Sequence, residues 1–422
     1  MKQIKTLLLA WFFLYALVEF FPVYRWIDLG MFVVCAVICL LWLLVNPNHI
    51  IITRQLLLPI SFLTFWLGYS LLSYIWAHDR MLAVSYSFWI LRYLLIFLMF
   101  SQIFRVQRIR ERFHLFLLLI MILYLGIAIY EMITWNHLPG SRYHGMMVPI
   151  PTGPFIGENI LAAYWLVLSP FLLFIPKLLN RSWLIPVVMI SIFLIIGIMV
   201  FQGARIAVIS MLALVGYYFV WHLRWKMKLA VLALMILVGY GLTLRYEQYS
   251  RILHTEIKHQ MDSIGEERQS IRMSSIKIRS QLIDETIEML SGSGGLGVGG
   301  GNYETVMLKE AKYRTGGITN PHSYLMELLG NFGVLVCLGF LALYFYWVSR
   351  LFLCFRRSDG KTRYLYLSYL LSLLLFIPAS SIPFSIRWDY FVWIYFAGIN
   401  AIAHADVDPK PGTDNTLSDQ IK

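Results

Sequence analysis

The chain has 422 residues, of which 59% are hydrophobic and 14% are charged. Soluble domains carry about 25% charged residues, so the composition excludes a soluble protein and indicates an integral membrane protein. The net charge of +12 would suggest a nucleic-acid partner in a soluble chain. Here the basic residues fall in short loops, where they set topology, and we expect no nucleic acid to bind.

Apolar runs long enough to span a bilayer, about 20 residues each, recur along the chain. The sequence predicts an all-α polytopic membrane protein with about 12 transmembrane helices and one long, partly helical extracytoplasmic loop. The predicted spans lie near residues 5–22, 27–46, 55–76, 81–104, 113–134, 160–179, 183–202, 206–222, 229–245, 323–349, 363–381 and 386–404. The first run lacks a cleavage site after it, so we assign it as a membrane helix.

Lysine and arginine are concentrated in alternate loops, which predicts the orientation. One set of loops is rich in basic residues, whereas the other set holds single ones: Arg25, Arg80, Arg142, Arg205 and Arg387. Both termini are therefore expected in the cytoplasm. The predicted organisation is helices 1–9 over residues 1–244, the extracytoplasmic loop over 245–322, helices 10–12 over 323–404 and a cytoplasmic tail over 405–422.

Other features narrow the possible functions. The four cysteines show no disulfide or zinc spacing, and Asp406 and Asp408 form an Asp-x-Asp pair in a tail expected to be disordered. We therefore predict no metal and no cofactor. Arg92 lies near the middle of a span and needs an ionised partner, for which Glu131 and Glu327 are the candidates.

The long loop contains a predicted helix, SSIKIRSQLIDETIEML. Ile276, Ile283, Ile287 and Leu290 form one stripe at helical spacing, and Arg279 falls on the same stripe. A buried arginine is costly unless an anion meets it. Arg279 is therefore either an anion-binding residue or an arginine that pairs locally or extends to water.

A glycine-rich run, SGSGGLGVGGGNYE, follows this helix. Gly295, Gly297 and Gly300 match G-x-G-x-x-G, but a dinucleotide site needs a strand before the motif, and here a helix precedes it. Two interpretations remain: a flexible linker, which the pattern alone favours, or tight turns that bring backbone N–H groups to a phosphate or sugar.

The sequence TNPHSYLMELL begins the next span. Asn320 is suited to the N-cap and Pro321 to the first helical position, which would place His322 in the first turn. The positive end of a helix disfavours imidazolium and attracts anions. Arg205, at the outer end of its span, would lie at the same depth, although an interfacial arginine can simply extend to water.

Four segments together resemble the bacterial O-antigen ligase and O-antigen polymerase superfamily of membrane C-type glycosyltransferases. They are GENILAAY, which contains Asn159; the turn before Arg205; Arg279 followed by LGVGGGNYE; and PHSYLMELLGNFGVLVCLGF. The chain departs from the family pattern with His322-Ser323 where His-Asn is common, and with Gly203-Ala204-Arg205 where Ser-Arg-Gly is common.

The resemblance implies a metal-independent, inverting glycosyltransferase in the bacterial inner membrane. Its donor would be a glycan on undecaprenyl pyrophosphate, and its acceptor a glycan or glycolipid. Arg205 and Arg279 would hold the pyrophosphate, and His322 would activate the acceptor hydroxyl. Possible supporting residues are Asn159, Gly297, Gly299, Tyr324 and Glu327.

The sequence leaves ligase and polymerase open. A transporter or flippase of lipid-linked sugars is the main alternative, but it predicts polar bundle-lining residues and two similar halves, and no internal repeat is visible. A sensor or scaffold that docks partners on the long loop is a third possibility, and it would tolerate loss of His322.

Overall fold

The computed structural model describes residues 14–20, 30–34, 37, 53–223, 225, 227–229, 232–233, 275–312, 318–381, 386 and 391–405. All regular secondary structure within these ranges is helical. The predicted spans near 5–22, 27–46 and 229–245, the first part of the long loop, and Asp406 and Asp408 lie wholly or mostly outside them.

Eight helices in this described part are long and apolar enough to cross a membrane, which confirms the all-α polytopic architecture. They are α3 (Arg54–Leu72, continued by η2, Ser73–Ile75), α4 (Arg80–Ile103), α5 (Gln107–Thr134), α6 (Glu158–Leu178), α7 (Leu184–Phe201), α8 (Arg205–His222), α12 (Tyr324–Arg357) and α13 (Gly360–Ser380). The shorter apolar helix α14 (Phe391–Ala403) follows. Each matches a predicted span, although α5 and α12 extend further than expected.

Helix α6 lies at the centre of the bundle. In its apolar segment 89% of the residues are buried, and it packs most extensively on α13, with further contacts to α5, α7 and α8. Its sequence is apolar on all sides, as expected for a helix surrounded by other helices.

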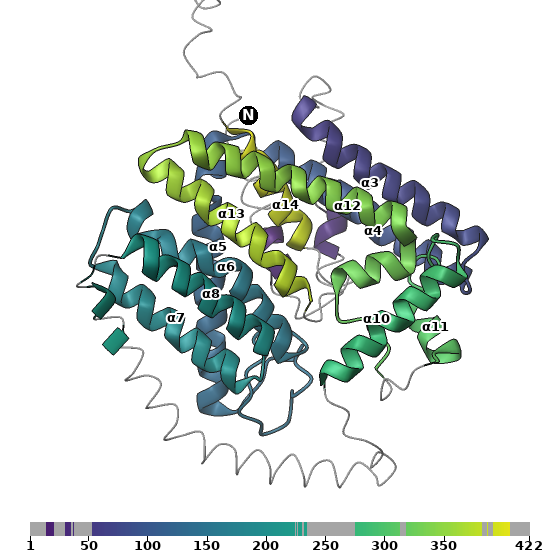
Figure 1. Cartoon of the computed structure of the whole chain (residues 1–422), viewed down its shortest axis with the longest axis horizontal. Helices are drawn as coiled ribbons and strands as arrows, with labels where there is room; N and C mark the ends of the chain where they lie inside the picture. The colour runs from purple at the N-terminus through teal and green to yellow at the C-terminus, as the bar shows by residue number, and fades with distance from the viewer. Residues whose placement is uncertain are drawn as a thin grey trace, which may run out of the picture.

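The connections between spans lie at two ends of the bundle. In Figure 1 the turn between α12 and α13 is at the upper left, whereas α10 (Ser275–Gly292) and α11 (Tyr303–Glu310) are at the lower right. We call the end with α10 and α11 the loop face. Because successive spans run in opposite directions, residues 76–79, 135–157 and 202–204 also belong to the loop face.

Arg92 forms a buried ion pair, but its partner is neither Glu131 nor Glu327. Arg92 Nη2 lies 2.5 Å from Glu19 Oε1, and both side chains are almost fully buried. Its guanidinium also lies 4.9 Å from the centre of the Phe32 ring. The two candidates are occupied elsewhere: Glu131 accepts hydrogen bonds from backbone N–H groups of the α5–α6 connection, and Glu327 accepts one from Ile386. The predicted partner was wrong because sequence spacing does not show which helices pack together.

Candidate functional site

The glycine-rich run forms a packed loop between α10 and α11. Four successive backbone N–H groups, those of residues 297–300, donate hydrogen bonds at 2.9–3.1 Å to acceptors in the protein. The acceptors are Ser293 Oγ, the Gly330 carbonyl, the Asn331 carbonyl and Ser73 Oγ. The loop is therefore not a flexible linker, and these N–H groups are not available to bind a phosphate.

The glycines in this loop are required by close backbone contact with α12. Gly297 has φ +79°, and a Cβ there would lie 2.6 Å from the backbone nitrogen of Gly333. Gly333 has φ +74° and interrupts the helical geometry of α12. Gly299 also has positive φ, and its Cβ would lie 2.6 Å from that of Ala77. These residues therefore hold the loop in a break of α12, which is a structural role.

The same loop is tied to the end of α3. The Tyr69 hydroxyl donates to the Leu296 carbonyl at 2.9 Å, and Trp76 Nε1 donates to the Gly297 carbonyl at 3.1 Å. Asn302 Oδ1 accepts a hydrogen bond from the Asp79 backbone N–H at 2.6 Å. Sequence reasoning missed these anchors; the polar segment WAHDR at residues 76–80, a turn between two spans, was the available signal.

Helix α10 buries a different stripe from the one predicted. Leu282, Thr286 and Met289 are buried, whereas Ile283 and Ile287 are 42% and 51% exposed. The buried stripe includes a threonine because the Thr286 hydroxyl is satisfied by the Leu282 carbonyl at 2.8 Å and the Tyr303 hydroxyl at 2.9 Å. An apolar pattern alone could not identify this face.

His322 precedes α12 and is not in its first turn. Ser323 is the N-cap, and its side chain accepts a hydrogen bond from Met326 N–H. Asn320 instead accepts the His322 N–H through Oδ1 at 2.8 Å, so the predicted cap was wrong. His322 has φ +50°, a conformation that is uncommon for residues other than glycine, and its backbone N–H is held by Asn320.

The imidazole of His322 is half-buried and lies close to Arg279. Burial lowers the pKa of His322 below its usual value, and the positive charge of Arg279 lowers the pKa further. Nδ1 is buried and makes no hydrogen bond to the part of the chain that the structure describes. The ring is therefore neutral near pH 7, and neither of its tautomers is fixed through Nδ1.

Neither Arg279 nor Arg205 forms an ion pair with a carboxylate among the described residues. On the same face, Arg142 Nη2 pairs with Glu158 Oε1 at 2.5 Å. Arg205 begins α8 after a turn in which Gly203 has φ +71°. This turn is fixed to the α5–α6 connection, because Gln202 Nε2 donates to the Pro151 carbonyl at 2.8 Å.

The structure brings some of the candidate residues together and separates others. Arg279 and His322 lie close enough for one charge to act on the other, whereas Arg205 does not contribute to the pKa shift of His322. Arg205 is the first residue of α8, which begins on the loop face. Asn159, in the first turn of α6 on this face, is half-buried.

The two supporting residues after His322 lie in the first turn of α12. Tyr324 is buried in the core of the helix bundle. Glu327 is buried, and its Oε2 accepts the Ile386 N–H at 2.9 Å. Glu327 therefore attaches α12 to the connection before α14 and supports the backbone next to His322.

Comparison with known proteins gives a family match on this part of the chain. Residues 190–341 match the model of the O-antigen ligase family. The resemblance to the O-antigen ligase and polymerase superfamily is confirmed. The matched residues include Arg205, Arg279 and His322.

A distant relative supports the same assignment. The chain is 22% identical over 362 residues to the teichuronic acid biosynthesis protein TuaE of Bacillus subtilis (strain 168), which covers 83% of this chain and 73% of that protein. The spans indicate a multi-pass membrane protein, and these matches support its similarity to the ligase and polymerase type of glycosyltransferase in polysaccharide assembly.

Proposed function

We propose that this protein transfers a glycan from undecaprenyl pyrophosphate to a hydroxyl group of an acceptor glycan or glycolipid. The reaction serves surface polysaccharide or lipopolysaccharide assembly at the outer face of the bacterial cytoplasmic membrane. The observation that carries the proposal lies on the loop face. Among the described residues, the half-buried imidazole of His322 has a buried Nδ1 with no hydrogen bond, and the guanidinium of Arg279, which has no carboxylate partner among them, acts on that ring.

His322 acts as the general base. A neutral imidazole takes the proton from the acceptor hydroxyl, and the hydroxyl oxygen attacks the anomeric carbon of the donor sugar. The bond from that carbon to the pyrophosphate oxygen breaks at the same time. A single displacement from the opposite side inverts the anomeric configuration.

Arg279 and Arg205 stabilise the leaving group. The electron pair of the broken bond passes to the pyrophosphate, whose negative charge increases in the transition state. Fixed guanidinium groups stabilise such charge through charge-assisted hydrogen bonds. Because their positive charge is permanent, the reaction needs no added metal.

The distribution of basic residues supports this topology. The connections at the end opposite the loop face carry many cationic residues: Arg105, Lys177, Arg181, Arg357 and Lys361. By the positive-inside rule this end faces the cytoplasm. The loop face is then extracytoplasmic, and the termini are cytoplasmic.

Reconstitution tests the proposal directly. Purified protein in nanodiscs, supplied with an undecaprenyl-pyrophosphate oligosaccharide and an acceptor, should form product by mass spectrometry, and EDTA should not reduce the yield. A second lipid-linked unit as acceptor tests polymerisation, and a lipid A core tests ligation. If no product forms but the donor lipid crosses liposome membranes, the transporter alternative replaces this function.

A matched histidine provides the control. His322→Ala should abolish transfer. His114, on α5 at the other end of the bundle, is also half-buried with a buried Nδ1 that makes no hydrogen bond to described residues, and His114→Ala should leave transfer intact. Full activity of His322→Ala would show that another group is the base.

A further inference from the structure

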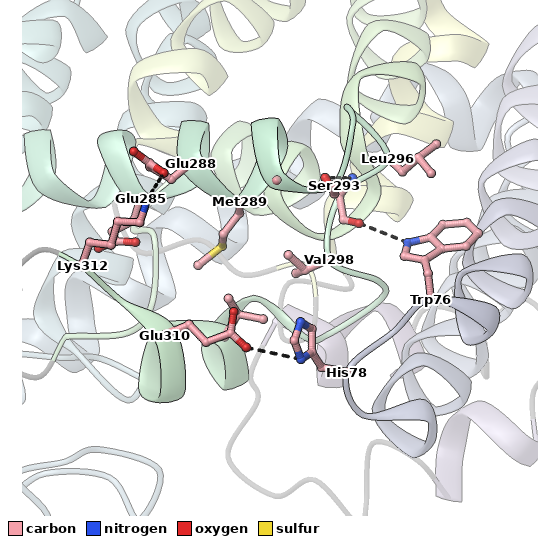
Figure 2. Close-up of a pocket in the computed structure, with 13 residues that line it drawn as sticks. Trp76, His78, Glu285, Glu288, Met289, Ser293, Leu296, Val298, Glu310 and Lys312 are labelled. Carbon is pink, nitrogen blue, oxygen red and sulfur yellow. Dashed lines mark hydrogen bonds and ion pairs between the residues drawn. The ribbon is translucent and has the colours of Figure 1, made fainter.

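A cavity of about 530 Å³ opens on the loop face, between α10, α11 and the residues that follow η2. Its lining includes the polar side chains of Trp76, His78, Glu285, Glu288, Glu310 and Lys312. Figure 2 shows Met289 of α10 pointing toward Glu310 and His78 on the other side of the cavity, with Glu288 beside Lys312. Its volume lies within the range of small-molecule sites, about 300–1,000 Å³. Neither Arg279 nor His322 lines it.

The cavity and the Arg279–His322 pair lie on different sides of α10. An α-helix turns about 100° per residue, so Arg279 and Glu288, nine residues apart, point in opposite directions. They are separated by about 13 Å along the axis. One helix therefore presents a cation toward His322 and carboxylates toward the cavity.

The charge of the cavity excludes the pyrophosphate. Glu285, Glu288 and Glu310 contribute three carboxylates, against the single ammonium of Lys312. A net negative lining repels phosphate and uronate groups. The ligand of this cavity is therefore a different part of the substrate from the one that meets Arg279.

The carboxylates are not arranged to hold a metal ion. Glu288 pairs with Lys312, and Glu310 Oε1 lies 3.5 Å from His78 Nδ1. In the described ranges no three potential ligands come together. Glu285 is buried, whereas the side chains of Glu288 and Glu310 are 42% and 53% exposed. An oxygen of these two that is not engaged can accept a hydrogen bond from a hydroxyl group.

The remaining lining is apolar. The indole N–H of Trp76 is already donated to the Gly297 carbonyl at 3.1 Å, so this residue offers its ring rather than a donor. Met289, Val298 and Val306 continue the apolar surface. A pyranose has the matching chemistry, with C–H groups on its faces and hydroxyl groups around its edge.

We propose that this cavity is a subsite for an uncharged sugar of the glycan substrate. The assignment rests on the proposed function, and it names which part of the substrate binds away from the reacting bond. The sugar belongs either to the donor glycan, some units from the pyrophosphate, or to the acceptor. Both sources have the same chemistry, and the experiment separates them.

Gly292 allows the cavity to be filled without disturbing the fold. It is exposed, it ends α10 and lines the cavity, and a Cβ on it would meet no atom within 4 Å. Gly216, exposed on α8 and equally open, is the matched control. Gly292→Leu should weaken binding of uncharged oligosaccharides at least tenfold, whereas Gly216→Leu should not.

Binding is measured with nanodisc-embedded protein on an array of hexose and N-acetylhexosamine oligosaccharides and their uronate-bearing counterparts. The uncharged series should bind better, and Glu288→Gln should reduce this preference. Unchanged binding of all glycans in both variants overturns the proposal. If Gly292→Leu does not fold, Glu288→Gln tests the proposal by itself: an unchanged preference for uncharged glycans in this variant overturns it.

The transfer assay identifies the source of the sugar. In Gly292→Leu a raised KM for the lipid-linked donor alone assigns the subsite to the donor, and a raised KM for the acceptor alone assigns it to the acceptor. The array needs no turnover, so a protein that binds uncharged glycans but transfers none would keep the subsite and reject the proposed reaction. If the protein transfers glycans but Gly292→Leu changes neither glycan binding nor either KM, the proposed reaction is kept and the subsite is rejected.

Discussion

The glycine-rich loop and the Arg279–His322 pair lie on the same face of the molecule, but their polar groups are satisfied to different degrees. In the loop, four successive backbone N–H groups are hydrogen-bonded within the protein. At His322, a buried ring nitrogen makes no hydrogen bond to described residues, and the neighbouring guanidinium has no carboxylate partner among them.

This difference indicates which region is structural and which is available for chemistry. Buried polar groups in folded proteins are nearly always hydrogen-bonded, and leaving one unpaired costs about 1–3 kcal/mol. The loop follows that rule and fixes α10 to α12. Nδ1 of His322 departs from it in a strained turn, as is common at functional sites. Nδ1 of His114 also makes no hydrogen bond to described residues, and what distinguishes His322 is the charge of Arg279 that acts on its ring.

The largest effect is expected from changing the base while keeping its backbone. Asparagine tolerates the left-handed conformation that His322 adopts, so His322→Asn should fold normally. Because a positioned base contributes about 10²–10⁴-fold, the transfer rate should fall by that factor with an unchanged melting temperature. A melting temperature reduced in proportion to the rate would instead show that His322 is structural.

The loop should show the opposite behaviour. Gly297→Ala forces a side chain into contact with Gly333 at a positive φ, which should destabilise the protein by about 3 kcal/mol through strain and overpacking. Gly294→Ala is the control: it has φ +61° and open space around it, so the cost should be about 1 kcal/mol. Thermal unfolding in detergent measures both, and equal effects would contradict the packed loop.

The contrast also shows what the sequence could predict. The spans were predictable because hydrophobic length is a local property, as α3 to α8 demonstrate. The buried stripe of α10 was not predictable from the sequence. It consists of Leu282, Thr286 and Met289, and it depends on Tyr303 of another helix, which forms a hydrogen bond with the Thr286 hydroxyl.

The candidate site was partly predictable for a similar reason. Motif order identified Arg279 and His322, and the structure brings them together. The glycine motif suggested phosphate binding, but only the fold shows that its N–H groups are already bonded to the Gly330 and Asn331 carbonyls. The partner of Arg92 was missed because the sequence does not show that the helix carrying Glu19 brings its carboxylate to α4.

A comparison of Arg205 with Arg142 tests whether a guanidinium without a carboxylate partner among the described residues binds the donor pyrophosphate. Arg205→Gln should raise the KM for the lipid-linked donor about 10–100-fold, since hydrogen bonds to charged groups contribute about 1.5–3 kcal/mol. Arg142→Gln, which removes the ion pair with Glu158, should leave this KM unchanged. Donor titrations in the transfer assay measure both. Equal KM values for Arg205→Gln and the unmodified protein would remove Arg205 from the site.

The smallest effect is the influence of Arg279 on the pH profile. Transfer requires neutral His322, so activity is lost as pH falls through its pKa, and burial together with Arg279 places this acidic limb below the usual pKa of 6.5. Removing the cation removes the second cause but leaves burial, so Arg279→Gln should move the limb upward, toward the usual pKa but not as far as it. Arg279→Lys keeps the charge and should keep the limb in place.

The maximal rate of Arg279→Gln will also fall because the pyrophosphate loses a partner, so the position of the limb, and not its height, is the relevant measurement. A limb that stays in place in the glutamine variant would mean that Arg279 does not act on the base.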